Sequence, residues 1–237
     1  MIYLLNIISL CLLFSCENKR LPPKPPTPVG ENQIKTFHLN YKPDKNWSKC
    51  STSDYVVFDM FDTSKEDFDR CKAMGAKMLC YFSSQYEEWR PDAKHFGKLG
   101  SKLDGWEGER WISPDDPKNL TVMKYRLGMA KWKCDGIDLD NIDREGHEQY
   151  ILEIFKEAKK LGLLVSQKNA IEKIEFFRPY VDLYQNEQCQ QYNECDYYRS
   201  VGKPVFNIEY KSCRSFPFMY SVQKDMQKMD SWEIKCE

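Results

Sequence analysis

Short apolar runs alternate with amphipathic stretches along most of the chain after residue 35. Short apolar runs bounded by turn residues are typical of buried strands, and apolar residues three or four positions apart are typical of helices. The pattern predicts strands at 36–40, 55–58, 77–83, 136–139, 163–167, 181–185, 204–208 and 232–235. It predicts helices at 64–74, 117–132, 145–161, 170–177, 194–201 and 221–229.

The segment 84–116 follows neither pattern, apart from a brief strand expected at 110–112, and reads as a long aromatic loop. A loop of this length inside a compact domain usually has a function. Strands that alternate with helices favour parallel pairing and βαβ units. About eight such strands in this length predict an α/β fold, a single-domain, somewhat trimmed (β/α)₈ TIM-like barrel. A doubly wound open sheet is the alternative, although no Gly-x-Gly-x-x-Gly fingerprint supports it.

The N-terminus has a different composition from the rest of the chain. Residues 1–16 are almost wholly apolar and too short to span a membrane comfortably, which predicts an export signal. Cys16 follows Leu-Phe-Ser, a degenerate lipobox, so a lipid anchor at Cys16 is an open alternative to free secretion. Residues 17–34 are polar and proline-rich and predict an extended tether. Residues 35–237 would form the barrel domain.

Charge and cysteine content narrow the function classes. The formal net charge is −1, and no basic stripe with interleaved aromatics occurs, so nucleic acid is not an expected partner. Eight cysteines follow residue 35, with only three His in the chain and no Cys-x-x-Cys pair, so we expect disulfides and no metal or other cofactor. Eight cysteines allow 105 pairings, and the sequence does not choose among them.

Polar residues stand where several predicted strands end, and this is where a barrel carries its active site. The predicted strand ends contribute Asp59, Tyr81, Asp138, Asp140, Lys168, Glu187, Glu209 and Tyr210. Two carboxylates across one pocket are the minimum equipment for cleaving a glycosidic bond, and Asp138 and Glu187 are the proposed pair. The structural alternative is that strand-end acids cap helices and that Lys168 pairs with a neighbouring acid. An acid-rich cavity favours a cationic or polyhydroxyl substrate.

Four segments resemble the endo-α-1,4-polygalactosaminidase family, glycoside hydrolase family 114. They are CYFSSQYEEWRPD, LDGWEGERW, DGIDLDN and NEQCQQYNEC, and members of that family commonly read CYFSAGSYEDWRPD, DGVDPDN and NEQCFQYNEC at corresponding places. The resemblance runs from about Val56 to Tyr210, with the motifs in the same order. This chain departs from the family at Leu139, where proline is usual, in a shorter loop after Asp143, and in a first strand without tryptophan.

The resemblance implies a secreted endo-acting glycoside hydrolase for a partly deacetylated, cationic, galactosamine-containing polysaccharide. Carried over by motif, Asp138 is the expected nucleophile and Glu187 the expected acid/base, with the two roles interchangeable. The residues expected to bind substrate are Asp59, Tyr81, Trp89, Asp140, Lys168, Glu209 and Tyr210. We expect a monomer. Two alternatives stay open: a non-catalytic carbohydrate-binding surface protein on a decayed barrel, and a hydrolase acting on another glycan.

Overall fold

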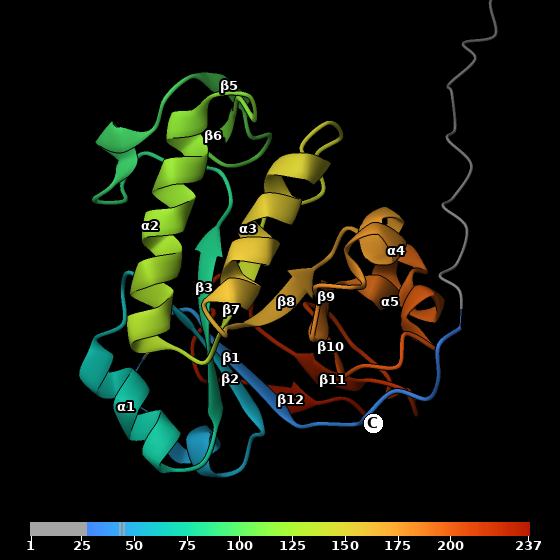
Figure 1. Ribbon diagram of the computed structural model, residues 1–237. Coiled ribbons are helices and arrows are strands. Elements are labelled where there is room, and N and C mark those ends of the chain that lie inside the picture. The colour runs from blue at the N-terminus through green and yellow to red at the C-terminus, as the bar shows by residue number, and fades with distance from the viewer. Residues whose placement is uncertain (1–27, 43, 45) are drawn as a thin grey trace, which may run out of the picture.

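One parallel sheet organises the chain (Figure 1). The computed structural model describes residues 28–42, 44 and 46–237. Its main sheet has the order β1-β2-β3-β7-β8-β9-β10-β11-β12, and every neighbouring pair is parallel except β11 and β12. The parallel strands are β1 Phe37–Asn40, β2 Tyr55–Asp59, β3 Lys77–Ser83, β7 Gly136–Asp140, β8 Leu164–Lys168, β9 Leu183–Glu187, β10 Val205–Glu209 and β11 Tyr220–Gln223. These eight strands confirm the trimmed barrel-like α/β fold.

The sheet is curled so strongly that its first strand returns to its last strands. Phe37 of β1 stacks on Phe206 of β10, with ring centroids 4.4 Å apart. Among the described residues no ladder joins β1 to β11, and a buried lysine helps to close this seam. Lys224 Nζ, just after β11, donates to the carbonyl oxygens of Leu39 (2.6 Å) and Asp230 (2.5 Å). The backbone N–H groups of Tyr41 and Lys42 also donate to the carbonyl oxygen of Met229 (2.9 and 3.2 Å). This seam is therefore closed by the Lys224 side chain and by these two backbone hydrogen bonds, and not by a strand ladder.

Apolar side chains fill the barrel and attach the helices to its outer face. Inside, the buried residues are Phe37, Leu39, Val57, Leu79, Leu183, Phe206, Ile208 and Val222. Outside, the long helices are α1 Lys65–Ala73, α2 Pro117–Lys133 and α3 Glu148–Lys160. The apolar stripe Ile151, Ile154, Phe155 and Ala158 of α3 is fully buried. Helices α2 and α3 pack side by side, α2 against β7 and α3 against β8 (Figure 1).

The later helices are shorter than the sequence predicts. The segment 170–177 forms a 3₁₀ turn, Ile171–Lys173, followed by α4 Ile174–Phe177. The segment around 194–201 forms α5 Cys189–Tyr192 and a 3₁₀ turn, Cys195–Tyr198. Left-handed backbone at Ala170 and Asn193 interrupts helical propagation at these points.

The predicted helix at 221–229 is wrong. The chain there forms β11, and a turn follows. Only Val222, Met226 and Met229 are apolar in this segment, and the valine is β-branched. Pairing with β10 buries Ser221 and Val222 and overrides the weak helical spacing. The last predicted strand shrinks to β12 Ile234–Lys235, which is antiparallel to β11 and lies outside the parallel set.

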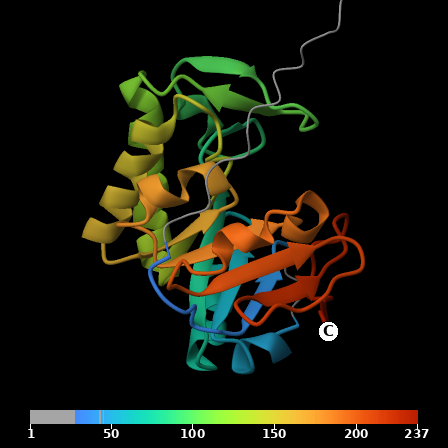
Figure 2. The ribbon, with the colours of Figure 1, turned by 90° about the vertical axis from the view of Figure 1, so that its right-hand side faces the viewer.

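The predicted loop 84–116 carries a small sheet of its own. Its antiparallel strands are β4 Tyr86–Glu87, β5 Leu99–Lys102 and β6 Glu109–Ile112, in the order β4-β6-β5. A short 3₁₀ turn, Ala93–His95, lies between β4 and β5, and another, Ser48–Ser51, precedes β2. In both views this small sheet lies beyond the end toward which the β3 arrow points (Figures 1 and 2).

Four disulfides cross-link the chain: Cys50–Cys71, Cys80–Cys134, Cys189–Cys195 and Cys213–Cys236. They confirm the expected use of cysteine and are typical of exported proteins. No helix in the described part of the chain is long and apolar enough to cross a bilayer. The predicted signal and Cys16 lie outside the described residues. Of the predicted tether, the described end is held at Asn32, whose Nδ2 donates to the carbonyl oxygen of Tyr198 (2.6 Å).

Candidate active site

Three neighbouring strands each end in a charged residue that is followed by left-handed backbone. The pairs are Asp140 with Asn141 (φ 58°), Lys168 with Asn169 (φ 53°), and Glu187 with Gln188 (φ 67°). Left-handed φ costs free energy for residues other than glycine, least for asparagine, and such strain clusters at functional sites. The strand ends of β7, β8 and β9 therefore form the candidate active site.

Lys168 joins the two outer carboxylates. Its Nζ lies 2.8 Å from Asp140 Oδ2 and 3.2 Å from Glu187 Oε2, so these two oxygens are separated by at most the sum of the distances, 6.0 Å. The lysine side chain is 4% exposed, whereas those of Asp140 and Glu187 are 16% and 18% exposed. Burial lowers the pKa of Lys168, but the two carboxylates outweigh it and raise the pKa above its usual value. A charged lysine therefore holds two solvent-reaching acids.

Two tyrosines also orient these carboxylates, Tyr81 through the Asp140 oxygen that Lys168 binds and Tyr210 through the Glu187 oxygen that the lysine does not bind. Tyr81 OH donates to Asp140 Oδ2 (2.7 Å), and Tyr210 OH donates to Glu187 Oε1 (2.8 Å). The backbone N–H of Asn141 donates to Asp140 Oδ1 (2.8 Å). Burial raises the pKa of Asp140, but Lys168 and these hydrogen bonds outweigh it, so the pKa lies below its usual value. Asp140 is therefore an ionised carboxylate at neutral pH.

Asp138 lies deeper in the barrel than Asp140. Its residue exposure is 0%, and Tyr41 OH donates to its Oδ2 across a long 3.4 Å contact. The Tyr41 ring stacks on Tyr81, with centroids 3.9 Å apart. Burial is the main cause that raises the pKa of Asp138 to about 7. This acid is thus protonated over much of the acidic range.

The structure brings six of the predicted site residues into one contact network: Tyr81, Asp138, Asp140, Lys168, Glu187 and Tyr210. Asp59 instead pairs with Arg90, whose Nη2 lies 2.6 Å from Asp59 Oδ2. Glu209 is turned away, since its neighbours Ile208 and Tyr210 face the barrel interior. Its Oε1 accepts from the backbone N–H of Gln190 in α5 (2.9 Å).

Trp89 lies apart from the strand ends. It is 53% exposed and packs beside Gly108 of the small sheet's hairpin. No contact joins it to Lys168 or the strand-end acids within the described residues. An exposed tryptophan can still stack on a sugar ring that extends over the surface.

Tyr41 is a site residue that the sequence reasoning missed. It follows β1 directly, two positions after the inward-facing Leu39, and strand alternation could have placed it inside.

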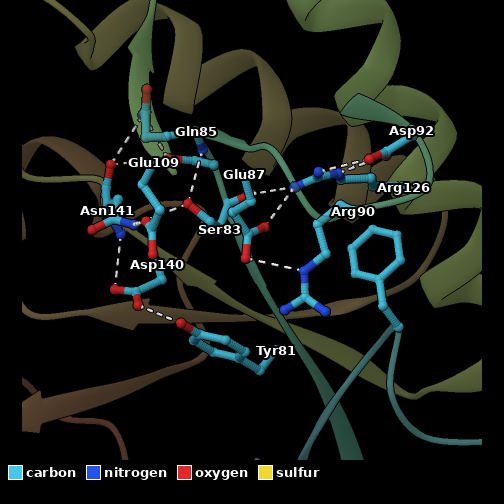
Figure 3. A network of polar contacts seen from close by, with 12 residues as sticks. Tyr81, Ser83, Gln85, Glu87, Arg90, Asp92, Glu109, Arg126, Asp140 and Asn141 are labelled. Atoms are coloured by element: carbon cyan, nitrogen blue, oxygen red, sulfur yellow. Dashed lines mark hydrogen bonds and ion pairs between the residues drawn. The ribbon is translucent and has the colours of Figure 1, made fainter. Parts of the chain in front are cut away.

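A second network, also missed, fixes the base of the small sheet (Figure 3). Arg126 of α2 is fully buried, and its Nε and Nη2 donate to Asp92 at 2.8 and 2.9 Å. Its Nη1 donates to the carbonyl oxygen of Ser83 at the end of β3 (2.8 Å). Arg90 Nε donates to Glu87 Oε1 (3.0 Å). Each buried charge here has an opposite partner, which indicates a structural function.

The small sheet also touches the strand ends. Asn141 Nδ2 donates to Ser83 Oγ (2.9 Å) and reaches Glu109 Oε2 of β6 at 3.4 Å (Figure 3). Gln85 Nε2 donates to the carbonyl oxygen of Asn141 (3.1 Å), and the backbone N–H of Ile112 donates to Gln85 Oε1 (3.1 Å). Asn141 therefore links Asp140 to the inserted sheet.

A pocket of about 390 Å³ opens beside Glu187. Its lining is acid-rich and consists of Asp143, Asn169, Ala170, Ile171, Glu172, Glu187, Gln188, Tyr192 and Glu194. A larger cavity of about 750 Å³ beside α2 contains none of the strand-end residues. Among the described residues no group of three or more His, Cys, Asp or Glu is placed to hold a metal ion.

Comparison with known proteins shows the family and the fold. The profile of glycoside-hydrolase family GH114 matches residues 20–234. The structure of Aspergillus fumigatus Ega3 in complex with galactosamine is similar at 28% identity and TM-score 0.74, covering 89% of this chain and 96% of Ega3.

More distant structures share the fold alone. The glycoside hydrolase domain of Pseudomonas aeruginosa PelA matches at 14% identity and TM-score 0.66, over 88% of this chain and all of that domain. The Thermotoga neapolitana maltogenic α-amylase AmyB matches at 8% identity and TM-score 0.56, over 85% of this chain and 69% of the amylase. No curated protein matches the chain by sequence. The profile match over nearly the whole described chain is decisive: this protein belongs to glycoside-hydrolase family GH114.

Proposed function

We propose that this protein is a secreted, endo-acting glycoside hydrolase that cleaves α-1,4-linked, galactosamine-containing polysaccharide with two carboxylates. The observation that carries the proposal is the pair Asp140 and Glu187, both reaching solvent and both held by the buried Lys168. Family membership and the galactosamine bound to Ega3 support the reaction class and the sugar. The acid-rich strand ends suit a cationic polymer.

Glu187 is one member of the proposed pair, and two aspartates compete to be the other. The sequence motif favours Asp138, whereas burial favours Asp140. A nucleophile must touch the anomeric carbon, and Asp138 is fully buried, with Tyr41 OH in contact with its carboxylate. We therefore place Asp140 at the sugar and assign Asp138 a supporting position below it.

The proposed reaction gives each acid one task. Asp140, kept ionised by Lys168 and Tyr81, attacks or stabilises the anomeric centre, and Glu187 donates a proton to the leaving oxygen and later recovers one from water. Retaining enzymes hold their carboxyl groups about 5–5.5 Å apart and inverting enzymes about 6.5–9.5 Å. The upper limit of 6.0 Å between the lysine-bound oxygens favours retention.

The test is product analysis after incubation of the full chain with polygalactosamine. We expect Asp140→Asn and Glu187→Gln each to lower the rate of reducing-end release by about 10³-fold or more, since each removes a group needed in the transition state. Asp138→Asn should cost much less, and the exposed control Asp196→Asn should cost nothing. A Glu187→Gln variant with the wild-type rate would contradict the mechanism. Loss in Asp138→Asn with full activity in Asp140→Asn would restore the motif-based pair.

A non-catalytic carbohydrate-binding function is the second candidate. Trp89 and Trp106 of the inserted segment are 53% and 56% exposed, which suits stacking on sugar rings. Saturable binding of the polymer without release of reducing ends would support this function. In either case we propose that the protein acts outside the cell as a monomer, secreted or anchored by a lipid at Cys16.

A further inference from the structure

Glu109 is a buried carboxyl without a cationic partner. It lies at the start of β6 in the small sheet and is 9% exposed. No lysine, arginine or histidine of the described chain pairs with it within 4.0 Å, although the neighbouring buried acids Glu87 and Asp92 pair with Arg90 and Arg126. Burying a carboxylate without a counter-ion is costly, so an unpaired one needs an explanation.

The surroundings of Glu109 place it next to the proposed site. Its Oε2 is 3.4 Å from Asn141 Nδ2, and the backbone N–H of the same asparagine donates to Asp140 Oδ1 (2.8 Å). The two carboxyl groups thus lie on either side of one residue, as Figure 3 shows. Burial, with the negative charges of Glu87 and Asp140, raises the pKa of Glu109 to about 7.

An ammonium group would complete this arrangement. The structure holds two acids at Asn141, and only Asp140 has a lysine. A cation that the substrate brings next to Glu109 would pair with this carboxyl and favour its ionised form. A hydroxyl or a neutral acetamide would leave the carboxyl uncompensated.

We propose that Glu109 binds the ammonium group of a non-acetylated galactosamine unit beside Asp140 and so selects deacetylated over N-acetylated polymer. The inference rests on the proposed function, because the sugar must lie at Asp140 and Glu187. On this proposal the small sheet determines which polymer is bound, and the barrel strands supply the carboxylates that cleave it.

The alternative for Glu109 is a purely structural one, as an acceptor for Asn141. The 3.4 Å contact is long for a hydrogen bond, and a glutamine at this position keeps the same length and an acceptor oxygen. Glu109→Gln therefore removes the charge and preserves the shape. Glu107→Gln is the matched control, since Glu107 is an exposed acid in the same hairpin.

The experiment compares kcat/KM on polygalactosamine with kcat/KM on the same polymer after chemical N-acetylation, using full-length protein. We expect Glu109→Gln to lose about tenfold or more on the free-amine polymer, mainly through KM, and to change less than twofold on the acetylated polymer. Glu107→Gln should leave both values unchanged, and Glu109→Asp, which keeps the charge, should keep the preference. A ratio of the two values that Glu109→Gln does not alter, or equal losses on both polymers, overturns the inference.

Calorimetric binding of galactosamine and N-acetylgalactosamine oligomers separates this inference from the proposed function. Wild-type protein that hydrolyses neither polymer contradicts the function, yet a wild-type preference for the free-amine oligomer that Glu109→Gln abolishes still supports the selection by Glu109. Equal binding of both oligomers by wild-type protein contradicts it.

Discussion

Asp138 is fully buried, and its protonation should change how the free energy of unfolding depends on pH. Its pKa is about 7 in the folded protein and about 3.9 in an unfolded chain. Between these values the folded state holds a proton that the unfolded state has released, so this group lowers stability as pH rises from about 4 to about 7.

Asp138→Asn should therefore become more stable relative to wild type as pH increases across that window. The difference should grow by up to about 1.4 kcal/mol per pH unit and level off above pH 7. Urea unfolding of both proteins at pH 5, 6, 7 and 8 with disulfides intact measures it. A difference independent of pH would show that Asp138 stays ionised throughout.

Much of the site could be predicted at the scale of single residues because strand ends collect in one place in a barrel. That rule found Asp140, Lys168 and Glu187. It misplaced Glu209, because a residue at a strand end faces inward or outward according to alternation, and Tyr210 takes the inward position. Glu109 could not be predicted as a site residue, since its neighbour Asn141 is 32 positions away in sequence and only tertiary packing joins them.

At the scale of elements, two glycines, one in a strand and one in a helix, have opposite expected effects. Gly136 starts β7, where a Cβ would lie 2.7 Å from the backbone oxygen and the Cβ of Leu164. Gly128 lies on the exposed face of α2, with nothing within 4 Å of an added Cβ. Steric crowding therefore sets the expected effect of a substitution at Gly136, and helix propensity sets it at Gly128.

Gly136→Ala should destabilise the protein by about 1–3 kcal/mol, because β7 and β8 must separate to admit the methyl group. Gly128→Ala should stabilise it by about 0.5–1 kcal/mol. Thermal unfolding of both variants at one pH provides the comparison. Two shifts of the same sign would contradict the close approach of β7 and β8.

The elements that the sequence predicted best are those whose pattern and packing agree. The stripe on α3 repeats at helical spacing and is buried as expected. The predicted helix at 221–229 has no such agreement, because pairing with the edge of β10 makes its first three residues part of β11. Of the small sheet, only β6 was predicted, as the brief strand at 110–112. The strands β4 and β5 were not, since they span only two and four residues.

At the scale of the whole molecule, the disulfides differ in how much chain they constrain. Cys80 and Cys134 are 54 residues apart, whereas Cys189 and Cys195 are 6 apart. In the loop-entropy description, removing the first should cost about 4 kcal/mol and removing the second about 2 kcal/mol. Double alanine variants compared by urea midpoint test this order. Equal losses would mean that native packing around each bridge, and not loop length, sets its contribution.

The barrel itself was predictable because alternating strands and helices leave few topologies. The seam at β1 was not, because the pattern of strands does not say whether the last one pairs with the first. Lys224 helps to close it, and a lysine in a polar turn gives no sign in sequence that it will be buried.

The Cys80–Cys134 bridge turns everything between its two cysteines into a covalent ring rooted in the barrel wall. The small sheet with Glu109 lies wholly inside that ring. A protease that cuts the hairpin there would leave both fragments attached. Insertions and deletions in this region are likewise confined between fixed ends. Relatives could therefore differ in the segment between these cysteines, and so in the sugar that they accept, while Asp140 and Glu187 keep their positions.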